Sequence, residues 1–186
     1  STTSSWATNL SSGPSDENSQ TLSFNISNNN NSLFNIQPAV SSSGVLTFTP
    51  ASNINGSATV TLSISDNGGT TNGGDNTSDN KTFIITITAV NDTPTDISLS
   101  STSINENEGF NTTVGSLTSM DADIGDSHTY TLVSGTGSTD NGSFAISGSS
   151  LNTAASFDHE TKSSYSILIR TQDSAGLPYE EAFTIT

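Results

Sequence analysis

Cysteine is absent from the 186-residue chain, which excludes a disulfide framework and any metal site built on thiolates. Basic residues are almost absent as well, since only three Lys and Arg stand against 18 Asp and Glu, for a formal net charge of -15. Such a charge repels nucleic acid and anionic membrane surfaces, and it attracts cations. Apolar runs are short, and none approaches the ~20 residues that span a bilayer. The sequence therefore predicts no nucleic-acid partner and no membrane insertion.

Hydrophobic residues make up only 30% of the chain, so any core must be small and built from short elements. They alternate with Ser, Thr or Asn in segments such as 22–26, 46–48, 60–64 and 130–132. This two-residue period is typical of half-buried strands, and the Asn-Gly and Ser-Gly clusters between the segments are typical of turns. No segment favours a helix longer than a turn or two. The sequence predicts an all-β chain folded as antiparallel β-sandwiches.

The two halves of the chain repeat one pattern. Phe34 and Phe144 each open a short apolar segment, and a strand pattern ending in Asp follows, at Asp66 in the first half and Asp173 in the second. Pro94 marks the boundary because proline interrupts strand pairing and holds the residue before it extended. We predict two tandem Greek-key modules, with the first strand of the first module upstream of Ser1, as expected for a fragment of a multi-repeat protein. The predicted ranges are 1–90 for module 1, 91–94 for a linker and 95–186 for module 2.

Acidic residues of the second half cluster in loops at short spacings. In Asp121-Ala-Asp123 the two carboxylates can converge on one point, because the side chain between them turns away. Calcium takes six to eight oxygen ligands, and oxygen donors without His or Cys favour calcium over zinc or copper. Each acid taken alone is more often a solvated loop residue, but the ordered set favours a cation. The set comprises Glu106 and Glu108, Asp121 and Asp123, Asp158 and Glu160, and Asp173.

Residues 94–186 resemble a cadherin repeat, because Asn-Glu-Asn at 105–107, Asp-Ala-Asp at 121–123, Phe-Asp-His-Glu at 157–160 and Asp173 follow in the order of that family. The family's Asp-Arg-Glu signature is present as Asp-His-Glu, and its inter-repeat linker is present in shortened form as Asn-Asp-Thr-Pro. The first half is similar to the bacterial cadherin-like repeats of surface and secreted proteins. That similarity rests on Gly-Pro-Ser-Asp-Glu at 13–17, Phe-Thr-Pro-Ala-Ser-Asn-Ile-Asn-Gly at 48–56 and the closing Val-Asn-Asp-Thr-Pro.

The resemblance implies calcium between consecutive repeats, held by both repeats and by the linker. Asn53 and Asn55 stand where the family has an acidic pair, so they would be weaker, neutral ligands. The other ligands implied at this junction are Asp121, Asp123, Asp173, Asn91, Asp92 and the Thr93 carbonyl. Those implied for an upstream junction are Asp16, Glu17 and Asp66, and those for a downstream junction are Glu106, Asp158 and Glu160.

The resemblance also implies a function: a calcium-dependent structural or adhesion module of an extracellular protein, in which calcium stiffens the connection to neighbouring repeats of the same chain. Two alternatives stay open. One is carbohydrate binding, with Trp6 or Tyr179 as an aromatic platform, although each is more often a core or edge residue. The other is homophilic adhesion to another copy of the chain.

Catalysis is not expected. The two histidines, His128 and His159, lie in polar, turn-like segments, and His159 occupies the variable middle position of the acidic motif. Glycoside hydrolysis by paired carboxylates needs an aromatic-lined cleft, which one Trp and three Tyr cannot easily supply.

Overall fold

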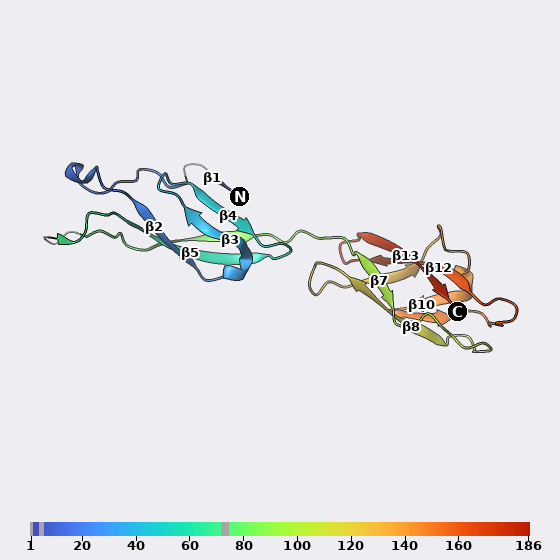
Figure 1. The fold of residues 1–186 in the computed structure, drawn as a ribbon. Coiled ribbons are helices and arrows are strands. Elements are labelled where there is room, and N and C mark those ends of the chain that lie inside the picture. The colour runs from blue at the N-terminus through green and yellow to red at the C-terminus, as the bar shows by residue number, and fades with distance from the viewer. Residues whose placement is uncertain (1, 4–5, 72–74) are drawn as a thin grey trace. The chain divides into compact units, whose positions relative to one another are not determined.

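The computed structural model describes residues 2–3, 6–71 and 75–186. They form two compact units, Ser1–Val90 and Asn91–Thr186 (Figure 1). Every regular element in the described ranges is a β-strand or a short 3-10 turn, which confirms the predicted all-β class. No helix among these residues is long and apolar enough to cross a membrane.

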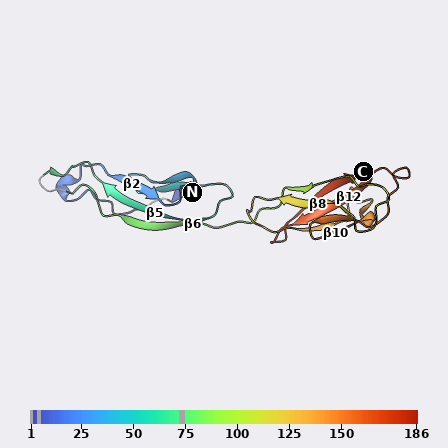
Figure 2. The ribbon, with the colours of Figure 1, turned by 90° about the horizontal axis from the view of Figure 1, so that it is seen from below.

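Unit 1 contains two three-stranded antiparallel sheets. Figure 2 shows the strands β2, β5 and β6, which pair in that order. Leu33 and Val60 are fully buried in the core, as the alternation of apolar residues predicts. One sheet consists of β1 (Thr2–Thr3), β4 (Leu46–Pro50) and β3 (Phe34–Val40). The other consists of β2 (Ser23–Asn28), β5 (Gly56–Ser65) and β6 (Lys81–Ile87). The 3-10 turns are η1 (Ser15–Glu17) and η2 (Asn31–Leu33).

Gly44 closes the turn between β3 and β4 with φ +82°, a left-handed conformation that side chains rarely adopt. A Cβ at this position would lie 2.1 Å from the Ala7 carbonyl oxygen, so the chain could not keep its path. Gly44→Ala is therefore expected to lower the free energy of unfolding of unit 1 by about 1–3 kcal/mol. Gly109 has ordinary φ and open space around it, so Gly109→Ala should change stability by less than ~1 kcal/mol. Urea unfolding of both variants measures the difference, and equal effects would contradict the assigned turn.

Unit 2 contains a four-stranded and a three-stranded antiparallel sheet. Between them lies a core that includes Ile167 and Ile169, both fully buried. Residues 102–104 add a short pairing at the edge, where the Thr186 amide donates to the Thr102 carbonyl at 2.8 Å. The four-stranded sheet consists of β10 (Phe144–Ser147), β11 (Ser150–Thr153), β8 (Thr113–Met120) and β7 (Asp96–Leu99). The three-stranded sheet consists of β13 (Pro178–Ile185), β12 (Tyr165–Gln172) and β9 (Thr129–Leu132). The 3-10 turn η4 is Asn141–Ser143.

The strand ends of unit 2 bring three segments together. Met120, the last residue of β8, pairs with Asp96 at the start of β7, so the loop that opens at Asp121 lies beside residues 91–95. Gln172, the last residue of β12, pairs with Thr129 at the start of β9. The loops 121–128 and 173–177 and the segment 91–95 therefore lie at one end of unit 2.

Candidate cation sites

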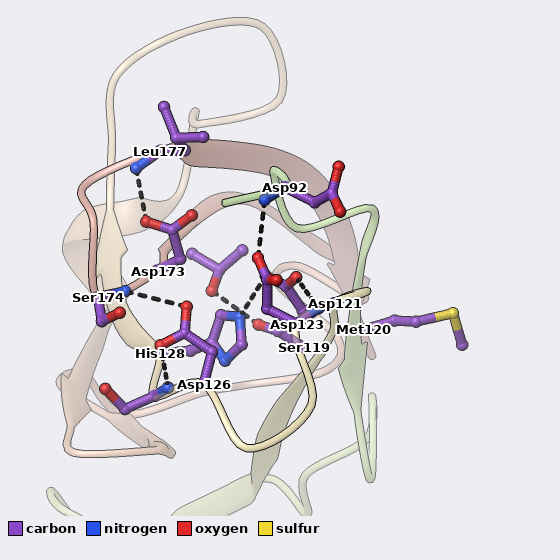
Figure 3. A network of polar contacts seen from close by, with 12 residues as sticks. Asp92, Ser119, Met120, Asp121, Asp123, Asp126, His128, Asp173, Ser174 and Leu177 are labelled. Carbon is purple, nitrogen blue, oxygen red and sulfur yellow. Dashed lines mark hydrogen bonds and ion pairs between the residues drawn. The ribbon is translucent and has the colours of Figure 1, made fainter. Parts of the chain in front are cut away.

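Asp173, which follows β12 in unit 2, is a buried acidic residue with 5% of its surface exposed. Its Oδ2 accepts a hydrogen bond from Asn91 Nδ2 at 2.7 Å. Its Oδ1 accepts one from the Leu177 amide at 2.7 Å (Figure 3). The carboxylate therefore holds the first residue of unit 2 against the loop that follows β12.

Asp123 and Asp121 extend this network on the other side. The Asp92 amide donates to Asp123 Oδ2 at 2.7 Å, and the Asp123 amide donates to Asp121 Oδ1 at 2.9 Å (Figure 3). His128 Nε2 lies 3.1 Å from Asp121 Oδ2, and both side chains are largely buried. Both carboxyl groups of the Asp-Ala-Asp motif thus bind backbone amides, one within the motif and one from the segment before β7.

Three carboxylates converge at this end of unit 2, those of Asp121, Asp126 and Asp173, each of which offers an oxygen within 4.8 Å of the others. Asp126 was not among the residues predicted from the sequence. Its Oδ2 accepts a hydrogen bond from the Ser174 amide at 3.4 Å, which draws it toward the Asp173 loop. A signal was available, because Asp126 follows the Asp-Ala-Asp motif in the same loop. Asp123, which was predicted, is engaged with Asp92.

Hydrogen bonding keeps two of these acids ionised. Burial raises the pKa of Asp173, but donors from Asn91 and from the backbone of the following loop outweigh it, and the net pKa lies below the ordinary 3.8. Hydrogen bonds from Ser174 and Ser127 likewise lower the pKa of Asp126. Asp126 and Asp173 therefore present carboxylate oxygens close together at neutral pH, next to the oxygens of Asp121, an arrangement that favours a bound cation.

Few cationic side chains balance this charge. In the described ranges, Lys162 is paired with Asp140, and Arg170 is paired with Glu180. Among those ranges the three converging acids have no Lys or Arg partner, and the His128 ring contacts Asp121. The donor set is entirely oxygen, which suits a hard divalent cation such as calcium.

A second group of acids comprises Glu106, Asp158 and Glu160, whose oxygens also lie within 4.8 Å of one another. All three side chains are exposed. Glu106 Oε2 accepts a hydrogen bond from the His159 amide at 3.3 Å, and a hydrogen bond from the Thr161 hydroxyl lowers the pKa of Asp158. The structure thus brings together the three residues predicted for a downstream junction, but without the burial of the first group.

The remaining predicted ligands are members of neither group. Asp16 and Glu17 are in η1, and Asp66 accepts a hydrogen bond from the Gly68 amide at 2.7 Å. These three do not form a third convergent group in the part of the chain that the structure describes. Their role at an upstream junction stays a prediction. Asn53 and Asn55 are exposed in the turn after β4 of unit 1, and Thr93 is exposed in unit 2.

The aromatic residues considered as sugar platforms pack against the cores. Trp6 is partly buried, and its ring centroid lies 4.6 Å from that of Phe83. Tyr179 packs against the core of unit 2. These contacts favour the core reading of both residues over an exposed platform.

The lowered pKa values predict how the metal-free protein responds to acid. In the folded state Asp126, Asp140, Asp158 and Asp173 all have a pKa below 3.8, with Lys162 as the main cause at Asp140. The folded state then binds fewer protons than the unfolded state. The stabilisation that these ionised carboxylates give to the folded state is complete above their unfolded pKa, and it is lost as the pH falls through their folded pKa values. Unit 2 should lose stability below about pH 4. Thermal unfolding from pH 7 to about pH 2 measures this, and Asp140→Asn should weaken the dependence. A flat profile would contradict the assigned hydrogen bonds.

Comparison with known proteins agrees with this description. Residues 100–186 match the family described as Cadherin domain, so the second unit is a cadherin-like repeat, as its motifs predict. No curated protein matches the chain.

Solved structures with a similar fold include three sets of cadherin ectodomain repeats. PcdhgB3 EC1-4 has a TM-score of 0.60 at 21% identity over 89% of this chain and 40% of its own. Human CDH23 EC21-23 has a TM-score of 0.60 at 20% identity over 92% of this chain and 63% of its own. Protocadherin Gamma B2 extracellular cadherin domains 3-6 has a TM-score of 0.59 at 17% identity, over 89% and 41%. The chain thus spans less than two thirds of each structure, and the likeness shows the fold.

Proposed function

We propose that this chain, whose second unit is a cadherin-like repeat, serves as a calcium-dependent structural and adhesive segment of an extracellular protein. One observation carries the proposal. Asn91 and Asp92, which open unit 2, are each hydrogen-bonded to a carboxyl group at the cation site, Asn91 to Asp173 and Asp92 to Asp123. A cation held by these carboxylates would therefore act on the connecting segment as well as on unit 2.

The residues present fit calcium. Asp121, Asp126 and Asp173 supply convergent carboxylates. Asp123 belongs to the same hydrogen-bond network, through the Asp121 carboxylate and the Asp92 amide, and its carboxylate could add a ligand. Calcium, when bound, supplies the positive charge that this group lacks. Extracellular modules bind it at ~10⁻⁴–10⁻³ M, so a calcium-rich medium would fill the site and depletion would empty it.

The chain's own residues determine the mechanical consequence. Without a cation, the convergent carboxylates repel one another, and the segment is held at residues 91–92 by two hydrogen bonds. Neutralising that repulsion lets the same carboxylates hold the segment firmly. The connection to the preceding repeat of the same chain then loses freedom, which suits a load-bearing spacer that presents an adhesive surface. We propose a binding role and no catalytic one, because His128 is engaged with Asp121 and His159 is exposed.

Backbone dynamics test the proposal. We expect the ¹⁵N NMR order parameters of residues 91–93 to rise toward the rigid value of ~0.85 in calcium from a lower value in EGTA. The Asn91 side-chain amide should shift at the same time. Asp121→Asn should suppress both changes, whereas Glu180→Gln, which removes an exposed charge on β13, should leave them intact. Order parameters that are the same in calcium and in EGTA would overturn the proposal.

A further inference from the structure

Three hydroxyl groups meet inside unit 2 next to the first acid group. Ser119 Oγ lies 2.7 Å from Thr171 Oγ1 and donates to the Tyr130 hydroxyl at 3.0 Å. Thr171 is fully buried, and Ser119 and Tyr130 are partly buried. Ser119 belongs to β8 of one sheet, and Thr171 and Tyr130 are cross-strand partners on β12 and β9 of the other. The hydroxyl network therefore joins the two sheets.

The place of this network follows from strand geometry. Every second side chain of a strand points to the same face, so the inward face of β12 runs from Ile169 to Thr171, and two residues later lies Asp173. The inward face of β8 runs in the same way from Leu117 to Ser119, with Asp121 two residues later. On both strands, the apolar residues of the inward face are therefore followed first by a hydroxyl residue and then by a carboxylate of the cation site. Figure 3 shows Ser119 next to that group of carboxylates.

We infer that the Ser119–Thr171–Tyr130 network is a positioning device for the cation site, a role that rests on the function proposed above. Apolar attraction has no preferred direction, whereas a hydrogen bond depends on both distance and orientation. The network fixes the ends of β8 and β12 against each other. It thereby sets the separation of Asp121 and Asp173, whose charges would otherwise push the strand ends apart.

Two substitutions of Thr171 distinguish a role in positioning the cation site from a role in core packing alone. Thr171→Val keeps the shape of the side chain and removes its hydroxyl, while Ser119 and Tyr130 can still bond to each other. The variant should bind calcium about 10-fold more weakly, which is the lower end of the loss seen when a group that orients a metal ligand is removed. Thr171→Ser keeps the hydroxyl and should bind like the wild type. Calorimetric titration of the full chain with calcium, in a Glu160→Gln background that weakens the exposed acid group, gives these affinities.

Thr153 supplies the matched control. It is 1% exposed, and its hydroxyl donates to the Gly109 carbonyl at 2.7 Å and accepts from the Thr112 amide at 2.9 Å. It lies beside the start of β8, at the far end of that strand from Asp121. Thr153→Val should lower the melting temperature without weakening calcium binding at the Asp121 group.

The outcomes separate the inference from the function on which it rests. A wild-type affinity in Thr171→Val, or a loss no larger than that in Thr153→Val, would overturn the positioning role. The proposed function would still stand in that case if Asp121→Asn removes binding. A wild-type chain that binds no calcium at this group would overturn both.

Discussion

Replacement of Asp173 by Asn is expected to remove the stabilisation that calcium gives to unit 2. The substitution keeps the size of the side chain and an oxygen that can accept from Asn91, but it takes away the charge that lies within 4.8 Å of Asp121 and Asp126. Calcium prefers carboxylate ligands, so the two remaining carboxylates, Asp121 and Asp126, should bind it too weakly for the site to fill at millimolar calcium.

The size of the effect follows from linkage. With a dissociation constant of ~10⁻⁴–10⁻³ M and calcium at ~10 mM, binding to the folded state alone stabilises the wild type by about 1.4–2.7 kcal/mol. For a unit of this size that corresponds to roughly 6 °C or more in the melting temperature. Differential scanning calorimetry in calcium and in EGTA measures the shift, which should be close to zero in Asp173→Asn.

Glu180→Gln is the matched control for charge. Glu180 pairs with Arg170 across the exposed face of β12 and β13, away from the convergent acids. The variant removes the same charge and should keep the calcium shift. A full shift in Asp173→Asn would exclude Asp173 as a calcium ligand.

The second large effect concerns the independence of the two cores. Ile169 is fully buried among Ile97, Leu117 and other core residues of unit 2, so Ile169→Ala should cost that unit about 2–5 kcal/mol. Leu33 is fully buried in the separate core of unit 1, where Leu33→Ala should have a similar cost. Each substitution is expected to destabilise its own unit and leave the other unchanged.

The sequence provides a separate optical probe for each unit. Trp6, the only tryptophan, lies in unit 1, and the three tyrosines, Tyr130, Tyr165 and Tyr179, lie in unit 2. Urea unfolding followed by tryptophan fluorescence and by near-ultraviolet tyrosine signals should show one shifted and one unshifted transition in each variant. Transitions that shift together in either variant would contradict independent cores.

The strands and much of the candidate cation site could be predicted from residue patterns. Alternation identifies β2 and β5, because their apolar residues occupy one face and Ser, Thr or Asn the other. The pairing of Asp121 with Asp173 follows from family motifs at two strand ends. Asp126 could not be predicted with equal force, because its place depends on a contact with Ser174, 48 residues away. The link between His128 and Asp121 likewise depends on how the loop closes.

The hydroxyl network could not be predicted from the sequence for a different reason. Ser and Thr are abundant on the outer faces of these strands, so a hydroxyl residue near a strand end carries little information by itself. Only the register, in which Thr171 continues the inward stripe of Ile167 and Ile169, distinguishes a buried hydroxyl from a solvated one. Cross-sheet contacts of this kind depend on packing between elements that sequence periodicity does not relate.

The central claim is that the carboxylates next to the segment 91–92 bind calcium, and equilibrium dialysis of the metal-free chain against radioactive calcium tests it directly. We predict saturable binding of at least one ion at ~10⁻⁴–10⁻³ M, with loss of that ion in Asp121→Asn and its retention in Glu180→Gln. No binding at ~10 mM calcium, or binding that Asp121→Asn leaves unchanged, would contradict the account.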